Sequence, residues 1–130
     1  MQPKIHVMLS IVDEALDPEE VTRSTGVVPT RVWQKGDIRP KTKIVETENG
    51  WELLSALSPA APLVEHVGHL LSTIHPGVTQ LQAFTRQYYS VLSCAVYCHE
   101  SSPEIHFEPS VIQKLAEMNL RLDIDIYCLE

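Results

Sequence analysis

Alternation of hydrophobic and polar residues predicts three long strands. Residues 4–12, 89–99 and 120–128 each place apolar side chains at every second position, which is typical of a strand with one buried face. The predicted inward residues are Ile5, Val7, Leu9, Ile11, Leu92, Cys94, Val96, Cys98, Leu120, Leu122, Ile124, Ile126 and Cys128. Shorter strand-like segments occur at residues 27–32 and 104–107.

Capping residues and helical spacing predict the helices between these strands. Asp17-Pro18-Glu19-Glu20 supplies an N-cap acid, a proline at the first helical position and an acid three residues after the cap. Gly26 is suited to end this short helix in the left-handed conformation. The longest helical signal begins near Pro62 and is interrupted at Pro76-Gly77, so we expect two consecutive helices or one kinked helix. Pro109 opens a last helix.

The order of elements predicts the fold class. Lys35-Gly36-Asp37 ends the segment at 27–32, a loop or hairpin returns through Ile44 and Val45, and Asn49-Gly50 marks a tight turn. The chain is then strand, helix, two or three strands, long helix, two strands, helix and strand. We expect one α+β domain over residues 1–130, with a mainly antiparallel sheet and helices packed on one face. The first and last strands would lie inside the sheet, in a layout related to the ferredoxin-like split βαβ arrangement.

Composition and charge narrow the class of protein. The 130 residues are 44% hydrophobic and 21% charged, which fits a single globular domain and excludes wholesale disorder. No apolar run reaches the roughly 18 residues of a membrane span, and the N-terminus lacks the features of a signal peptide. The three cysteines fall in strand-like segments, so we interpret them as small buried hydrophobes in a reduced, cytoplasmic protein. A net charge of −7 argues against a general affinity for nucleic acid.

Half of the cations are concentrated in one short segment. Residues 31–43 carry five of the ten cations and one acid, a net charge of +4, so the rest of the chain carries −11. Exposed ion pairs contribute only about 0–1 kcal/mol each, so stability gives a weak reason for such clustering. If the chain has a partner, we expect this segment to contact it as a binding site for an anion or an acidic partner, with Trp33 as its aromatic anchor. The residues of this site are Arg31, Trp33, Lys35, Asp37, Arg39, Lys41 and Lys43. The structural alternative, which we favour for the segment taken alone, is a solvated hairpin with Trp33 packed underneath.

A second candidate site lies on the polar face of the predicted sheet and comprises His6, Asp123, Asp125 and Tyr127. Asp123 and Asp125 project from one strand face, about 6–7 Å apart. Paired carboxylates can bind a metal ion or act as acid and base. The sequence offers neither a nucleophile nor a third ligand at suitable spacing, so we favour a polar outer face stabilised by cross-strand contacts.

The other titratable clusters also have two interpretations. Acids between residues 13 and 20 either stabilise a helix start, which we favour, or face a basic partner. His66 and His69 are three residues apart on the long helix, and we interpret them as solvated or partner-facing side chains and not as zinc ligands. Glycine motifs of nucleotide-binding proteins and α/β-hydrolases are absent from the sequence. We therefore expect no metal ion and no cofactor.

Several of these motifs occur together in one known family. They are the alternating first strand, residues 17–22, Gly26 with Pro29-Thr30 after it, Lys35-Gly36-Asp37, the Trp51 segment ending in Leu57, the long helix with His66, and residues 122–127. In this succession the chain resembles an uncharacterised bacterial family, domain of unknown function 4279. The resemblance spans nearly the whole chain and implies a small soluble cytoplasmic α+β protein, with no catalytic residue to carry over. The basic run 39–43 departs from the family pattern.

These observations favour a binding protein over an enzyme. The concrete hypothesis is an immunity protein or similar inhibitor whose acidic face covers the cationic active site of a toxin, with electrostatic attraction speeding association. A second copy of the chain is the other partner that the charge distribution suggests, and neither nucleic acid nor a membrane is expected. The competing hypothesis is an enzyme or small-molecule-binding protein that uses the polar sheet face with His6, Asp123, Asp125 and Tyr127.

Overall fold

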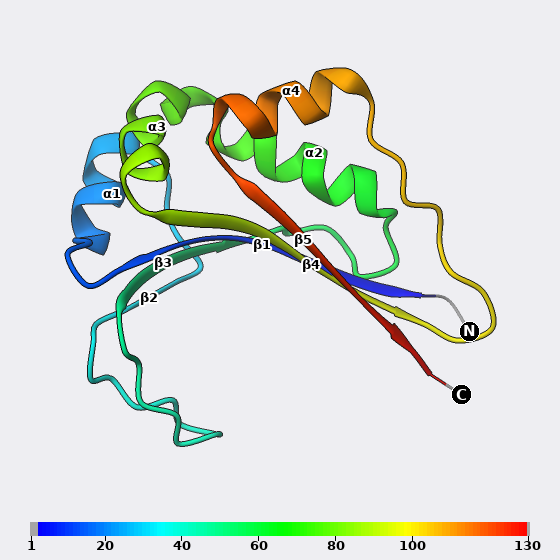
Figure 1. Cartoon of the computed structure of the whole chain (residues 1–130), viewed down its shortest axis with the longest axis horizontal. Helices are drawn as coiled ribbons and strands as arrows, with labels where there is room; N and C mark the ends of the chain where they lie inside the picture. Colours follow the sequence, from blue (N-terminus) through cyan, green and yellow to red (C-terminus); the bar gives the residue numbers. More distant parts are fainter. Residues whose placement is uncertain (1–2, 130) are drawn as a thin grey trace.

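A five-stranded sheet carries the helices on one of its faces in the computed structural model, which describes residues 3–129 (Figure 1). The strands are β1 (Lys4–Asp13), β2 (Arg31–Trp33), β3 (Asn49–Leu54), β4 (Tyr89–Cys98) and β5 (Arg121–Cys128). The helices are α1 (Pro18–Thr25), α2 (Leu63–Ile74), α3 (Val78–Gln87) and α4 (Pro109–Glu117), with a 3₁₀ turn η1 (His75–Gly77) between α2 and α3. This architecture confirms the predicted α+β class.

The sheet has a ferredoxin-like topology with one added strand. Its order is β2-β3-β1-β4-β5, and each neighbouring pair is antiparallel except β4–β5, which is parallel. β1 and β2 therefore run parallel on either side of β3, and β3 and β4 run parallel on either side of β1. These are two interlocked split βαβ units. α4 and β5 extend the sheet beyond β4, so the first strand lies at the centre of the sheet as predicted. The last strand forms an edge, contrary to the prediction that it would lie inside the sheet.

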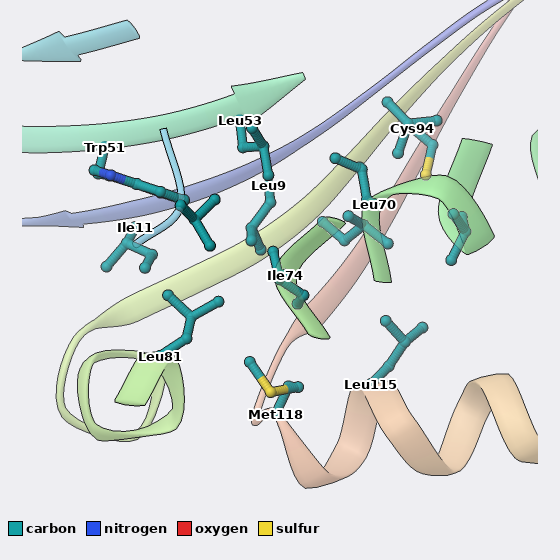
Figure 2. Close-up of a cluster of buried hydrophobic side chains, with 14 of the residues drawn as sticks. Leu9, Ile11, Trp51, Leu53, Leu70, Ile74, Leu81, Cys94, Leu115 and Met118 are labelled. Carbon is teal, nitrogen blue, oxygen red and sulfur yellow. The ribbon is translucent and has the colours of Figure 1, made fainter. Parts of the chain in front are cut away.

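The core fills the space between the sheet and the helices. The inward residues of β1 are at most 2% exposed, as the alternation predicted. Figure 2 shows Leu9, Ile11, Trp51 and Leu53 of the sheet meeting Leu70, Ile74, Leu81, Leu115 and Met118 of the helical layer. Because every helix contributes to this one cluster or borders it, the helices and the sheet stabilise each other.

Local sequence signals set the ends of the helices. The Asp17 side chain accepts a hydrogen bond from the Glu19 N–H (3.1 Å), and Gly26 ends α1 with φ of 72°. Pro76 lies in η1, where the long helical signal divides into two helices as predicted. Pro109 begins α4. Among the described helices, none combines the length and apolar character needed to cross a membrane.

Three predicted segments differ from the structure. Strand pairing at 27–32 begins only at Arg31, because Pro29 has no N–H to donate to a neighbouring strand. Asn49-Gly50 does not form a turn but begins β3, where Gly50 pairs with Val12 and Trp33. Residues 104–107 are irregular and belong to none of the five strands.

The cysteines are only partly as predicted. Cys94 and Cys98 are buried on the helix-covered face, and burial raises the pKa of the Cys94 thiol to about 12. Cys128 is exposed, contrary to the prediction, because β5 is an edge strand near which the helical layer ends. Cys98 and Cys128 are register partners on the parallel strands β4 and β5.

Candidate functional site

One face of the sheet is not covered by helices (Figure 1), and we call it the helix-free face. It includes Lys4, His6, Met8 and Ser10 of β1, Arg31 and Trp33 of β2, Glu52 and Leu54 of β3, Tyr89, Val91, Ser93, Ala95 and Tyr97 of β4, and Arg121, Asp123, Asp125 and Tyr127 of β5. All four residues of the predicted sheet-face site lie here, because the register of β1, β4 and β5 aligns the residues whose side chains point to this face. His6 and Asp125 both align with Ala95, so a strand separates them and they are about 10 Å apart.

Aromatic side chains stand at both ends of the helix-free face. Tyr97 and Tyr127 stack with ring centroids 4.8 Å apart and planes at 15°, and the His6 ring meets Tyr97 edge-on at 6.2 Å. At the other end the Arg121 guanidinium lies 4.4 Å from the centroid of the Tyr89 ring. Tyr89 and Tyr127 remain 46% and 45% exposed. The sequence analysis did not single out Tyr89 and Tyr97, although the alternation that placed Tyr127 on this face places them there too.

Carboxylates on this face lie in two environments. Asp123 and Asp125 align with the uncharged Ser93 and Ala95 of β4, and neither forms an ion pair within the described residues. Glu52 is partly buried, and this desolvation raises its pKa, although the guanidinium of Arg31 opposes the shift. The acidic character of the helix-free face is therefore strongest at its β5 edge.

The basic segment forms most of a hairpin, residues 34–48, that projects from the sheet on the side away from the helices (Figure 1). Folding supplies acids to three of its five cations. Glu46 is 8% exposed and pairs with Arg31 at 3.4 Å and with Arg39, and Lys35 pairs with Glu14 at 2.6 Å. Much of the positive charge of the segment is therefore paired with acids of the same molecule.

The tip of the hairpin differs from its base. Lys41 and Lys43 are exposed and form no ion pair within residues 3–129, and Lys43 has a positive φ of 61°. Asp37 accepts a hydrogen bond from the Gln34 N–H (2.8 Å), which shapes the turn. A hollow of about 300 Å³ lies among residues of the base, including Arg31, Trp33, Arg39 and Glu46.

Trp33 is packed and not displayed. It is 7% exposed, the Arg31 guanidinium lies 4.3 Å from its ring centroid, and its indole lies against Gly50. The alternative interpretation, a solvated hairpin with Trp33 packed underneath, therefore describes this residue correctly. Trp33 offers little surface to a partner. Its role in the structure is to fix the base of the hairpin on the sheet.

Glu46→Ala is expected to loosen this base and lower the free energy of unfolding by about 1–2 kcal/mol, because a buried acceptor of two guanidinium groups is removed. The two arginines are more than a third exposed, so water replaces part of the lost interaction. Urea unfolding followed by circular dichroism measures the change. Lys41→Ala at the tip is the control, and its free energy of unfolding should lie within about 0.5 kcal/mol of wild type. Equal losses for both variants would contradict the conclusion that the base is held more firmly than the tip.

His66 is buried, in contrast to the prediction of a solvated or partner-facing histidine. It is 1% exposed, its Nδ1 is 2.7 Å from the Ser55 Oγ, and its Nε2 has no hydrogen-bond partner in the described structure. The ring faces inward because the start of α2 lies close to the segment that follows β3. Burial is the main cause that lowers the pKa of His66. Within residues 3–129 no group of three or more histidine, cysteine or acidic side chains is arranged to hold a metal ion.

Acidification is expected to destabilise the protein through His66. Because its folded pKa lies below its unfolded value of about 6.5, the unfolded state takes up the proton first. The free energy of unfolding therefore keeps its full contribution from neutral His66 above about pH 6.5. It falls as the pH drops from there toward the folded pKa, by at most about 1.4 kcal/mol per pH unit. Unfolding free energies of wild type and His66→Asn between pH 7 and 5 measure this loss, which the variant should lack.

His106→Asn is the control for this pH dependence. The exposed His106 ring pairs with Glu108, which raises its pKa and stabilises the folded state at low pH. Replacing it cannot remove an acid-induced loss that originates at His66. An equal pH dependence in wild type and His66→Asn would show that other groups cause it.

The acids near α1 serve the structure. Asp13 accepts a hydrogen bond from the Ala15 N–H (2.8 Å), Asp17 caps the helix, Glu20 pairs with Arg23, and Glu14 pairs with Lys35. The contacts of Asp17 and Glu20 agree with the helix-start interpretation, whereas Asp13 stabilises the turn after β1 and Glu14 pairs with the hairpin. A groove of about 640 Å³ between α2, α3 and α4 lies on the helical side and contains none of the predicted site residues.

The structure thus brings the sheet-face residues and the hairpin onto the same side of the molecule. No curated protein and no solved structure matches the chain. A family model described as "Domain of unknown function (DUF4279)" matches residues 3–129. This match covers every element from β1 to β5, so the chain belongs to the DUF4279 family, as its motif succession indicated.

Proposed function

We propose that this chain is a protein-binding module whose binding surface consists of the helix-free face and the adjoining hairpin tip. The observation that carries the proposal is a tyrosine pair on a sheet face without helices, in which the partly buried Tyr97 stacks on the exposed Tyr127. Tyrosine is enriched at protein interfaces because it offers a large rigid apolar surface together with a polar tip. Stacking holds these two rings in place before a partner arrives, which lowers the entropy lost on binding.

The dimensions of the surface favour a macromolecule over a small ligand. Five strands at about 4.8 Å spacing make a face about 19 Å across, which fits a protein interface of standard size. The predicted site residues are distributed across it: the hairpin adjoins the β2 edge, and Asp123, Asp125 and Tyr127 lie at the β5 edge. Small-molecule sites instead gather their polar groups in a concave pocket.

The charges of the surface indicate the class of partner. Lys41 and Lys43 at one end and Asp123 and Asp125 at the other favour a partner with the opposite arrangement of charges. The net charge of −7 favours a cationic protein overall, because attraction between opposite net charges speeds association. A cationic toxin, neutralised by a chain acting as its immunity protein or inhibitor, is the partner class that fits these charges.

Affinity capture from the native host tests this proposal with three baits. They are the wild type, the variant Tyr97→Ala/Tyr127→Ala, and the control Ile105→Ala/Ile112→Ala, which changes two exposed residues outside the helix-free face. We expect a protein that the wild type and the control retain and that the tyrosine variant loses, because aromatic hot-spot residues cost about 2 kcal/mol or more each when truncated. Retention by all three baits, or loss with the control alone, would contradict the proposed surface.

A second measurement separates the toxin hypothesis from other protein partners. The captured protein is expressed with and without this chain, and cell growth is followed. Arrest that wild type relieves and the tyrosine variant does not relieve supports an immunity protein. Tight binding of a metabolite or metal ion at His6, Asp123, Asp125 and Tyr127, with no protein captured, would instead favour the competing small-molecule function.

A further inference from the structure

β5 is an edge strand with an unusually open outer side. It pairs only with β4 among the described strands, and most of its residues are exposed although several are apolar. Leu122 is 37% exposed and Ile126 is 47% exposed, although both lie on the helix-covered face. Natural proteins usually protect such edges with proline, charged side chains (lysine above all), a bulge or a covering segment. The eight residues of β5 contain neither proline nor lysine, carry Arg121, Asp123 and Asp125 as their only charges, and keep a regular register with β4 along their whole length.

The backbone of β5 presents hydrogen-bonding groups to the empty side. The Leu129 N–H donates to the Cys98 carbonyl of β4 at 2.8 Å. Because residues of a strand direct their backbone groups alternately to either side, Asp123, Asp125 and Tyr127 also face β4. The N–H and C=O groups of Leu122, Ile124 and Ile126 therefore point away from the sheet.

The side chains next to this edge have a pattern that specifies what would pair with it. On the helix-free face stand Asp123 and Asp125, whose neighbours on β4 are uncharged and which have no ion pair within the described residues. On the helix-covered face stand half-exposed apolar residues. A strand that continued this pattern would carry cations opposite the aspartates and apolar residues on the other face, because opposite charges and apolar pairs stabilise neighbouring strands.

We propose that β5 binds an extended segment of alternating basic and apolar residues, which adds to the sheet as a sixth strand. This inference rests on the proposed function, since the segment belongs to the same cationic protein partner. Backbone hydrogen bonds to residues 122, 124 and 126 hold the segment, and Asp123 and Asp125 select its basic side chains. Apolar side chains of the segment cover the exposed surface of Leu122 and Ile126.

A second copy of this chain fits the edge less well. In the registers that keep nearly all of β5 paired, antiparallel pairing of two β5 strands about Ile124 sets each Asp123 opposite the Asp125 of the other copy. Pairing about Asp125 sets the two Asp125 carboxylates opposite each other. Like charges in directly opposed positions destabilise a strand pair, so the charge pattern of β5 favours a basic partner over self-association.

Amide hydrogen exchange tests the strand addition directly, with an acetylated ten-residue peptide of alternating lysine and valine as the probe. We expect the amides of Ile124 and Ile126 to exchange rapidly in the free protein and at least about tenfold more slowly with saturating peptide. The amides of Asp123 and Asp125, already bonded to β4, should change little. Unchanged exchange at Ile124 and Ile126 with the peptide would overturn the proposal, as would slow exchange that depends on protein concentration alone, which would identify a second copy.

Two matched pairs of variants sharpen the test. Ile126→Pro removes an outward N–H at a position where an edge strand accepts proline, and Ile126→Ala shortens the same side chain but keeps the N–H. We expect Ile126→Pro to abolish the protection and Ile126→Ala to retain it. Asp123→Lys/Asp125→Lys should weaken the lysine–valine peptide about tenfold or more and instead bind a glutamate–valine peptide. Equal behaviour of the proline and alanine variants, or no change in charge preference, would contradict the proposal.

The same variants separate this inference from the proposed function. Used as a bait, Ile126→Pro keeps every side chain of the helix-free face. A partner that this bait retains and that Tyr97→Ala/Tyr127→Ala loses would leave the proposed function standing and overturn the strand addition. A partner that both baits retain would overturn the proposed binding surface itself.

Discussion

Trp51→Ala is expected to lower the free energy of unfolding by about 3–5 kcal/mol, a large part of the stability of an ordinary domain. The Trp51 side chain is fully buried, and it lies in the core beside Ile11 and Leu53 (Figure 2). Its indole N–H also donates to the Thr22 hydroxyl at 3.1 Å, which joins β3 to α1. Truncation leaves a cavity beneath α1 and removes this bond. Denaturant unfolding of the purified variant measures the loss.

Val32→Ala is the matched control for this substitution. Val32 pairs with Trp51 across the strands but is 46% exposed, so its truncation should cost well under about 1.5 kcal/mol. Trp51→Phe keeps an aromatic ring without the N–H and should fall between the two. Similar losses for Trp51→Ala and Val32→Ala would mean that Trp51 does not fill the core as described.

Gly50→Ala is expected to have the second largest effect, a loss of about 3 kcal/mol, through the opposite face of the same strand. A Cβ at Gly50 would lie 2.0 Å from the Trp33 ring, far inside contact distance. The indole would have to leave its place on the backbone and with it the cation–π contact to Arg31. Unfolding experiments and the fluorescence of Trp33 in a Trp51→Phe background report the displacement.

Gly68→Ala provides the control with the same chemical change. No atom lies within 4 Å of a Cβ added at Gly68, and this glycine is inside α2, so alanine should raise stability by up to about 1 kcal/mol. A destabilisation of similar size at both glycines would point to a general effect of alanine and not to contact with Trp33.

The sequence predicted the buried faces of the strands because a strand with one buried side has apolar residues at every second position. β1 and β4 follow it closely, whereas β5 shows the same alternation but lies at an edge, which no pattern within the strand reveals. Asparagine–glycine is common in turns, so the sequence alone predicts a turn at Gly50. Its function in the structure depends on Trp33, a contact that only strand pairing creates.

The candidate site was predicted in part. Alternation alone placed His6, Asp123, Asp125 and Tyr127 on one face, because each strand fixes the direction of its own side chains. The neutralisation of the hairpin base was not foreseen, since Glu14 and Glu46 reach Lys35, Arg31 and Arg39 only after the chain folds. His66 lies beside the apolar stripe of α2, and no helical pattern could show that Ser55 would meet its ring.

The hairpin has a base that is fixed to the sheet and a tip that is exposed to solvent. Its base is fixed by Trp33 on Gly50 and by the arginine–Glu46 contacts, while residues 40–43 at the tip are exposed and make few side-chain contacts. Sequence change at the tip therefore costs the fold little, and it alters the charge and shape of an exposed surface. Within the proposed binding surface, such a loop would let one scaffold acquire new binding preferences by replacing a few residues while the sheet beneath stays as it is.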